Sequence, residues 1–281
     1  MEAEAGEEDT GEMMTQRDRR LWLIHALLEE MPQYQYPVFP YTQERQWRLL
    51  RSLMNVRPPR PVSEEFLQIQ DAYLQEMTRE KGVTEADSLT PCAADSRLFL
   101  WQGDITTLRC GAIVNAANSG LRGCFQPCHS CVDNIIHTMS GVQLRLACHE
   151  IMKEQGHEEP AGQAKITPAF NLPCRYVLHT VGPIVKEELK KAHEDLLASC
   201  YRSCLDLAAE HGIESIAFCC ISTGVFSFPN RRAAEIALQT VTAWLDKHPD
   251  SGMRVIFNVY TDQDREIYEQ LLSGLEKKES I

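Results

Sequence analysis

The chain has 281 residues, a formal net charge of −12, and 43% hydrophobic and 24% charged residues. These proportions are ordinary for a globular protein and exclude collagen-like and wholly disordered chains. The length suits one large domain, or one domain with a substantial extension. The acidic balance argues against a nucleic-acid partner, because phosphate backbones are held by clustered Lys and Arg. An anionic ligand would instead be bound locally, by backbone N–H groups, helix N-termini or a metal ion.

The eleven cysteines are an odd number, and the chain opens on an acidic stretch rather than on a charged and then apolar leader. No apolar run approaches the length needed to span a bilayer, so no membrane partner is expected. We therefore predict a cytoplasmic or nuclear protein, and of the two we favour the cytoplasm. In that setting the thiols are reduced core residues or metal ligands rather than a disulfide framework.

The first third of the chain predicts an acidic tail and three helices. Residues 1–15 are acidic and nearly free of aromatic anchors, which is typical of a disordered tail. Apolar residues then recur at helical spacing and stop at Pro32, and a second such stripe stops at Pro58. Ser63 can cap a third helix, and the two glutamates after it suit the positive end of the helix dipole. Residues 16–82 are therefore expected to form a helical N-terminal extension.

From about residue 96, short apolar runs alternate with longer helical patterns. The runs predict buried strands at Leu98–Trp101, Ala112–Val114, Tyr176–Val181, Ile216–Cys220 and Val255–Val259. The helical patterns lie near Asp133–Glu154, Glu187–Glu210, Asn230–Asp246 and Asp262–Leu275. This alternation predicts an α/β domain over residues 96–281, with a mainly parallel or mixed sheet covered on both faces. Residues 83–95 are then the expected linker.

The segment Gly123–Cys131, with the sequence GCFQPCHSC, places three thiols and one imidazole within eight residues. Zinc prefers thiolate and imidazole ligands, and a loop with glycine and proline can fold several of them around one ion. The spacing is not that of a zinc finger, since no second CxxC pair is present to close a structural site. The alternative is that these are small buried residues. A glycine-punctuated loop, however, is a poor place to bury three thiols for packing alone.

Histidines also follow this loop along the chain. His137 and His149 lie on the helix that is predicted next, and there we expect satisfied structural histidines rather than ligands.

Two loops of small residues follow predicted strands, Gly103–Thr106 and Ser222–Phe226. In α/β sheets, ligands bind beyond the carboxyl ends of the strands. A turn of small residues before a helix exposes consecutive N–H groups that can hold a diphosphate. Taken alone, the Ser-Thr-Gly sequence is more often a simple turn.

These two loops, together with Ile113–Asn118 (IVNAAN) and Val181–Pro183, occur in the order typical of macrodomains. The chain resembles that family from residue 97 to about residue 275. The resemblance implies a three-layer α/β/α fold with a mixed sheet. The cysteine loop and the segment Val132–His137 resemble more closely the zinc-containing branch, the microbial protein-ADP-ribose hydrolases, which also carry a helical N-terminal extension.

The resemblance implies one zinc ion per chain, held by Cys124, His129 and Cys131 at the spacing of the family's ligands. Cys128 departs from the pattern as an additional thiol. Three protein ligands leave an open fourth position, as catalytic zinc requires, whereas a fourth thiolate would close the site. We favour the open site, because adjacent residues such as Cys128 and His129 rarely both reach one ion without strain. Val225 is a second departure, since an acidic residue is expected there, although a backbone N–H contact would survive the change.

Nucleotide-binding roles also come from the resemblance. Asp104 would accept a hydrogen bond from the adenine amino group, Ile105 would supply a backbone contact, and Asn118 would face the distal ribose. The residues that would wrap the diphosphate and the neighbouring ribose are Ser222, Thr223, Gly224, Val225 and Phe226. Structural alternatives exist for single positions: Asp104 can cap a turn, Asn118 tolerates a left-handed loop conformation, and Phe226 can be a core residue.

Catalysis, by the same resemblance, would occur beside the distal ribose. Zinc there could polarise an oxygen of the substrate or lower the pKa of a bound water. Asp133 occupies the place of the acidic residue of other hydrolytic macrodomains. With Asn118 it forms our candidate catalytic pair, positioning water or acting as base, although it could equally cap the helix that begins there.

The implied substrate is a mono-ADP-ribosylated protein, modified through an ester at an acidic side chain in a sirtuin-type reaction, with a lipoyl-carrier protein as a target class. Two alternatives stay open. The first is a non-catalytic ADP-ribose reader with structural zinc. The second is a redox-sensitive module in which thiol oxidation ejects the metal.

Overall fold

The computed structural model describes residues 14–34 and 39–279. The acidic tail expected over residues 1–15 lies almost wholly outside these residues. Within the described ranges, no helix has the length and apolar character that crossing a membrane requires.

A seven-stranded mixed sheet lies at the centre of the α/β part, in the order β2-β3-β9-β8-β5-β7-β6. The five inner strands run parallel, and the edge strands β2 and β6 pair antiparallel with their neighbours. The strands are β2 (Pro91–Cys92), β3 (Asp95–Gln102), β5 (Ala112–Ala117), β6 (Ala164–Pro168), β7 (Tyr176–Val181), β8 (Ser215–Phe218) and β9 (Arg254–Val259). Because both faces are covered, the inner strands are almost continuously apolar.

Helices cover both faces of this sheet. They are α4 (Val132–Ser140), α5 (Val142–Gln155), α6 (Lys191–Glu210), α7 (Asn230–Lys247) and α8 (Asp262–Glu279). His179 of β7 contacts Cys148 of α5, whereas the next residue, Thr180, contacts Cys200 of α6. Successive side chains of a strand point to opposite faces, so α4 and α5 cover one face and α6 lies on the other, side by side with α7. The predicted three-layer α/β/α fold with a mixed sheet is confirmed.

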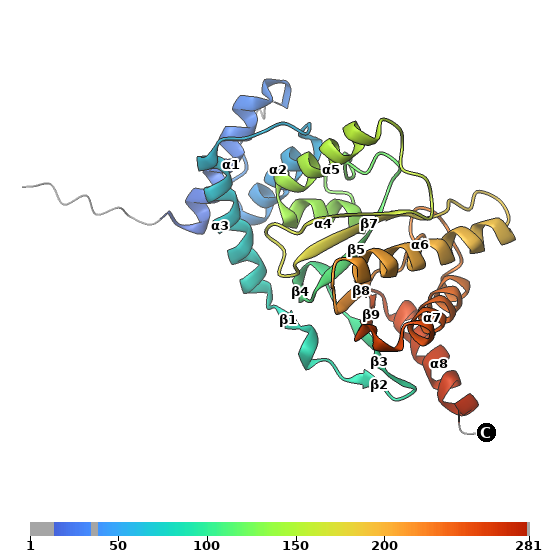
Figure 1. Ribbon diagram of the computed structural model, residues 1–281. Coiled ribbons are helices and arrows are strands. Elements are labelled where there is room, and N and C mark those ends of the chain that lie inside the picture. Colours follow the sequence, from blue (N-terminus) through green and yellow to red (C-terminus); the bar gives the residue numbers. More distant parts are fainter. Residues whose placement is uncertain (1–13, 35–38, 280–281) are drawn as a thin grey trace, which may run out of the picture.

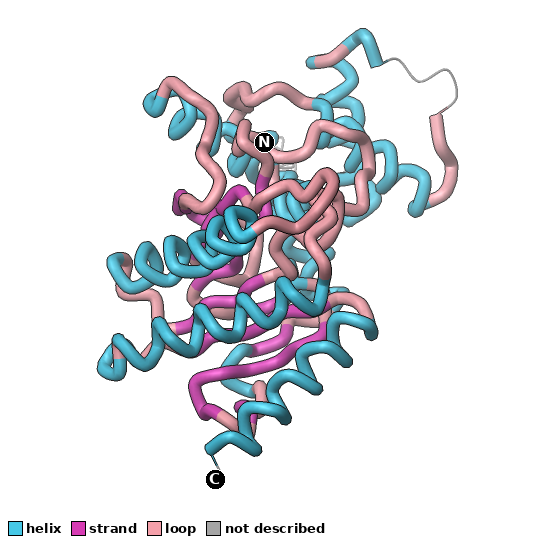
Figure 2. Tube along the Cα trace, turned by 90° about the vertical axis from the view of Figure 1, so that its right-hand side faces the viewer, coloured by secondary structure: helices cyan, strands magenta, loops and turns pink. Residues whose placement is uncertain are grey.

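The predicted N-terminal helices are also present, as α1 (Gln16–Glu30), α2 (Gln43–Val56) and α3 (Glu64–Lys81). Ser63 caps α3 as expected, its hydroxyl accepting the N–H of Phe66 at 3.1 Å. Leucines of α1 and α2 form a second apolar core, separate from that of the sheet, which Val142 of α5 joins. Figures 1 and 2 show these helices gathered beside α4 and α5, on the side of the molecule away from α8.

The structure differs from the sequence predictions in three places. The expected linker, residues 83–95, contributes strands: β1 (Thr84–Glu85) pairs with β4 (Leu108–Arg109), and β2 pairs with β3. The helix expected over 133–154 is two helices, because Gly141 adopts a left-handed φ of 98° between them. The edge strand β6 was not predicted, since only Thr167 of its five residues is buried and it therefore has no apolar run.

Candidate functional site

The cysteine loop lies between the end of β5 and the start of α4. The ligand atoms of Cys124, His129 and Cys131 all lie within 4.8 Å of one another. Cys131 is also the N-cap of α4, its thiol accepting the N–H of Asn134 at 3.4 Å. The Nδ1 atom of His129 is buried and has no hydrogen-bond partner among the described residues. Two thiols and an imidazole with an unpartnered ring nitrogen suit a soft or borderline metal ion such as zinc. Zinc binding itself stays a prediction.

The additional thiol of Cys128 points away from this group. Its Sγ lies 3.2 Å from the Ser52 hydroxyl and 3.4 Å from the Arg48 carbonyl oxygen, both on α2. The backbone at Cys128 is left-handed, with a φ of 51°. The three predicted ligands therefore lie close together without the fourth thiol, and the open zinc site stays a prediction.

Asp133 and Asn118, the predicted catalytic pair, are in contact. Asp133 lies in the first turn of α4 and is buried, and its Oδ2 is 3.3 Å from Asn118 Nδ2. Asn118 is exposed at the end of β5, and its amide also donates to the Gly123 carbonyl at 3.2 Å. Burial raises the pKa of Asp133 to about 6, although the hydrogen bond from Asn115 acts to lower it. One exposed amide thus connects the cysteine loop to the buried carboxyl group.

Asn115 is a site residue that the sequence reasoning missed. Its Nδ2 donates to Asp133 Oδ1 at 2.8 Å and lies 3.2 Å from Nδ1 of His179 on the neighbouring strand β7. Because an amide nitrogen only donates, Nδ1 of His179 is the unprotonated nitrogen, and Nε2–H donates to the Thr167 hydroxyl at 2.9 Å. Burial lowers the pKa of His179 to about 3, so the ring is neutral. The signal in the sequence that could have identified Asn115 is a polar residue inside an otherwise apolar strand.

A second group of potential ligands is fully buried behind Asp133. The ligand atoms of His137, Cys148 and His179 lie within 4.8 Å of one another. The expectation of a satisfied histidine is wrong for His137, because neither ring nitrogen has a hydrogen-bond partner among the described residues. The same expectation is met at His149, whose Nδ1 accepts a hydrogen bond from Arg122 at 2.9 Å.

Asp104 begins the short 3-10 helix η3 (Ile105–Thr107) after β3. Its Oδ1 accepts the backbone N–H and the hydroxyl of Thr106, at 3.0 and 2.6 Å, and its Oδ2 lies 3.2 Å from the ammonium group of Lys81 on α3. Burial acts to raise the pKa of Asp104, but the Thr106 hydrogen bonds and the Lys81 charge outweigh it, and the pKa falls below its usual value. Asp104 is therefore a turn cap, as the structural alternative proposed, and its carboxylate is also paired with the N-terminal extension.

The loop 222–226 leads from β8 towards α7. Ser222 is left-handed, with a φ of 65°, and its buried hydroxyl has no partner among the described residues. Val225 is 71% exposed, and the Phe226 carbonyl accepts the N–H of Val185 at 2.9 Å. The N–H groups of Gly224, Val225 and Phe226 find no acceptor in the described ranges. These are the free donors that an anion needs.

Gly182, the central residue of the Val-Gly-Pro motif, makes room for this loop. A Cβ atom at Gly182 would lie only 1.9 Å from the Ser222 hydroxyl oxygen. The motif therefore sets how closely the end of β7 approaches the loop after β8.

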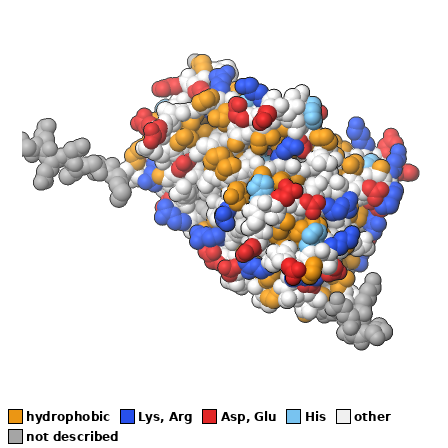
Figure 3. Space-filling view, in the orientation of Figure 1, with side chains coloured by type: hydrophobic (Ala, Val, Ile, Leu, Met, Phe, Trp, Pro, Cys, Tyr) orange, Lys and Arg blue, Asp and Glu red, His pale blue; other side chains and the backbone are white. Residues whose placement is uncertain are grey.

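Asp104, Asn118 and Ser222 follow three parallel strands, β3, β5 and β8, so all three lie at the carboxyl edge of the sheet. On the face of the molecule in Figure 3, basic side chains are interspersed with acidic ones rather than gathered into a broad basic surface. The carboxyl edge therefore offers an anionic ligand the local N–H donors of the loop 222–226. The cysteine loop lies at the same edge, at the end of β5.

Comparisons with known proteins agree with this architecture. The Macro domain family model matches residues 114–237. A protein-ADP-ribose hydrolase of Treponema medium is 57% identical over 262 residues, covering 92% of this chain and 100% of that protein. A protein-ADP-ribose hydrolase of Staphylococcus aureus strain MSSA476 is 49% identical over 259 residues, covering 92% of this chain and 96% of its own length. With this coverage the similarity includes most of the N-terminal helices.

Solved structures show the same fold. The Oceanobacillus iheyensis macrodomain with ADP is 40% identical, with a TM-score of 0.59, and covers 64% of this chain and 92% of its own. The Trypanosoma brucei macrodomain in complex with ADP-ribose is 29% identical, with a TM-score of 0.61, and covers 79% and 94%.

Proposed function

The chain belongs to the macrodomain family of protein-ADP-ribose hydrolases, and we propose that it is a zinc-dependent member that releases mono-ADP-ribose from an ester with an acidic side chain. The observation that carries the proposal is the position of Asn118. Its amide contacts both the Gly123 carbonyl in the cysteine loop and the buried carboxyl of Asp133. A substrate group held by Asn118 would therefore lie beside the predicted metal ligands.

ADP-ribose would be held along the carboxyl edge of the sheet. The free N–H groups of Gly224, Val225 and Phe226 are suited to the diphosphate, and Ser222 offers an unpartnered hydroxyl. Asp104 and Ile105 would bind the adenine end, with Asp104 Oδ2 shared between the adenine amino group and Lys81. The solved macrodomains with ADP and ADP-ribose support this class of ligand.

Cys124, His129 and Cys131 would hold the zinc ion, and their geometry fits a three-ligand site. When bound, zinc in such a site supplies a Lewis acid beside the distal ribose. Hydrolysis consumes one water molecule and returns the free carboxyl group of the modified protein and ADP-ribose.

Asn118 would orient the distal ribose, since it is exposed at the end of β5. The sequence suggested that Asp133 positions water directly. Because Asp133 is buried and contacts the Asn118 amide, we propose instead that it acts through Asn118. We assign Asp133 the role of fixing the Asn118 amide, and Asn115 that of fixing Asp133. The lipoyl-carrier protein as a target class rests on the resemblance alone.

The competing function is a reader that binds ADP-ribose without cleaving it. A fourth thiolate would favour that reading, but the Cys128 thiol faces α2. The test follows release of ADP-ribose from a protein modified at acidic residues, with and without a chelator. We expect release that the chelator abolishes and zinc restores. Equal release after chelation would refute zinc dependence, whereas binding of ADP-ribose without release would establish the reader.

A further inference from the structure

Helix α2 of the N-terminal extension lies along the cysteine loop. The guanidinium group of Arg51 donates through Nη2 to the His129 carbonyl oxygen at 2.7 Å and to Asn134 Oδ1 at 2.7 Å, and its Nε also reaches Asn134 Oδ1 at 3.1 Å. One planar donor group therefore ties the backbone of a predicted ligand to the first turn of α4. Lysine has no equivalent fork of donors.

Asn55, one helical turn further along α2, continues this contact. Its Oδ1 accepts the N–H of Cys128 at 2.9 Å, and its Nδ2 donates to the Thr138 hydroxyl at 3.0 Å. Residues 48, 51, 52 and 55 all reach the loop or α4, and their spacing places them on one face of the helix. The contact of α2 with the cysteine loop and α4 therefore involves one whole face of α2.

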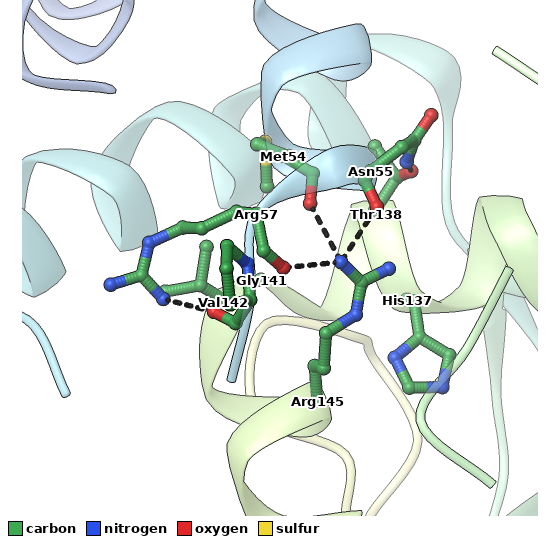
Figure 4. A pocket seen from close by; sticks show the side chains of 9 residues that line it. Met54, Asn55, Arg57, His137, Thr138, Gly141, Val142 and Arg145 are labelled. Atoms are coloured by element: carbon green, nitrogen blue, oxygen red, sulfur yellow. Dashed lines mark hydrogen bonds between the residues drawn. The ribbon is translucent and has the colours of Figure 1, made fainter. Parts of the chain in front are cut away.

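Arg145 of α5 joins the end of α2 to the beginning of the loop. It is buried, and Figure 4 shows its guanidinium group among the backbone carbonyls at the end of α2. The carbonyl oxygens that accept from it are those of Met54 (3.2 Å), Asn55 (2.7 Å), Arg57 (2.7 Å), Arg122 (2.8 Å) and Cys124 (3.4 Å). Carbonyls at a helix C-terminus lack partners within the helix and carry partial negative charge, so they suit a buried cation. The same guanidinium group stacks on Phe125, 4.0 Å from the ring centroid.

We propose that α2 positions the metal loop, with Arg51 and Asn55 holding its second half and Arg145 its first. The proposal rests on the proposed function, in that the loop is taken to bind zinc. The loop contains one glycine and one proline and has no regular structure between Gly123 and Cys131, so contacts from outside must fix where its ligands lie. Partners that fix metal ligands in this way typically contribute about 10- to 100-fold to metal affinity. The N-terminal extension is, in this proposal, part of the metal site.

The experiment compares zinc retention in the unsubstituted chain and in the Arg51→Met variant, with Arg48→Met as the matched control. Arg48 lies on the same helix, its side chain is exposed, and only its backbone carbonyl contacts the loop. Zinc release to a chromogenic chelator is followed over time. We expect release from Arg51→Met to be about tenfold faster or more, and release from Arg48→Met to match the parent. Arg51→Lys should not restore the parent rate.

Two further measurements separate positioning from general loss of stability. Hydrogen exchange of residues 122–131 in the zinc-free protein should be faster in Arg51→Met and unchanged in the sheet. Affinity for free ADP-ribose should change little. Equal zinc release from the parent and from Arg51→Met would overturn this inference and leave the proposed function intact. A parent protein that binds no zinc would overturn both.

Discussion

The neutral, buried His179 makes a quantitative prediction about stability against pH. Its Nδ1 accepts from Asn115 and its Nε2–H donates to Thr167, an arrangement that protonation would break. Burial lowers its pKa to about 3 in the folded protein, from 6.5 in the unfolded chain. Above pH 6.5 both states are neutral, and His179 adds no pH dependence. Below pH 6.5 the unfolded chain binds a proton that the folded protein does not, so folding loses stability as the pH falls.

The size of this loss follows from the two pKa values. At about pH 5, protonation of His179 stabilises the unfolded chain by about 2 kcal/mol, and the free energy of unfolding falls by the same amount. The matched variant is His179→Gln, because Oε1 of glutamine can accept from Asn115 and its Nε2 can donate to Thr167, yet it does not titrate. Its stability at neutral pH should be somewhat lower than that of the parent.

Urea unfolding of both proteins between about pH 7.5 and pH 5 provides the measurement. The parent should lose about 2 kcal/mol more than His179→Gln over this range, so that the two curves converge as the pH falls. Titrating groups that do not interact with His179 affect both proteins alike and cancel in the difference. Parallel curves would show that His179 titrates alike in the folded and unfolded states, and the reasoning on the neutral ring would be wrong.

Three further predictions concern the site. Cys128→Ala should keep its zinc, whereas Cys131→Ala should lose it; metal analysis of the purified variants decides this, and equal loss would mean that Cys128 is a ligand. Asn118→Ala should lower the rate of ADP-ribose release by about a hundredfold, because misalignment is felt chiefly in the transition state. Its affinity for free ADP-ribose should change far less, and a fall in affinity as large as the fall in rate would argue against an orienting role. Gly182→Ala should lower the free energy of unfolding by about 1 to 3 kcal/mol and weaken ADP-ribose binding, because its Cβ would displace Ser222; an unchanged affinity in calorimetry would contradict the second part.

The sequence by itself determined the features that depend on neighbouring residues. Apolar runs marked the five inner strands, because both faces of those strands are buried. Ser63 marked a helix start, because a cap is a local hydrogen bond. The ordered motifs identified the family, which the comparisons confirm. The convergence of Cys124, His129 and Cys131 was also accessible, since eight residues of loop leave three ligands little room to separate.

Only the tertiary structure decided which distant residues complete the site. Asn115 and His179 are 64 positions apart and meet because β5 and β7 pair in register. Arg51 reaches His129 across 78 positions because α2 packs against α4. Such contacts leave no periodic signal, since a lone polar residue in a strand or an arginine on a helix looks like many others. The strands at residues 84–85 and 91–92 escaped prediction for a related reason: they are only two residues long, and their hydrogen-bond partners, rather than their own apolar character, make them strands.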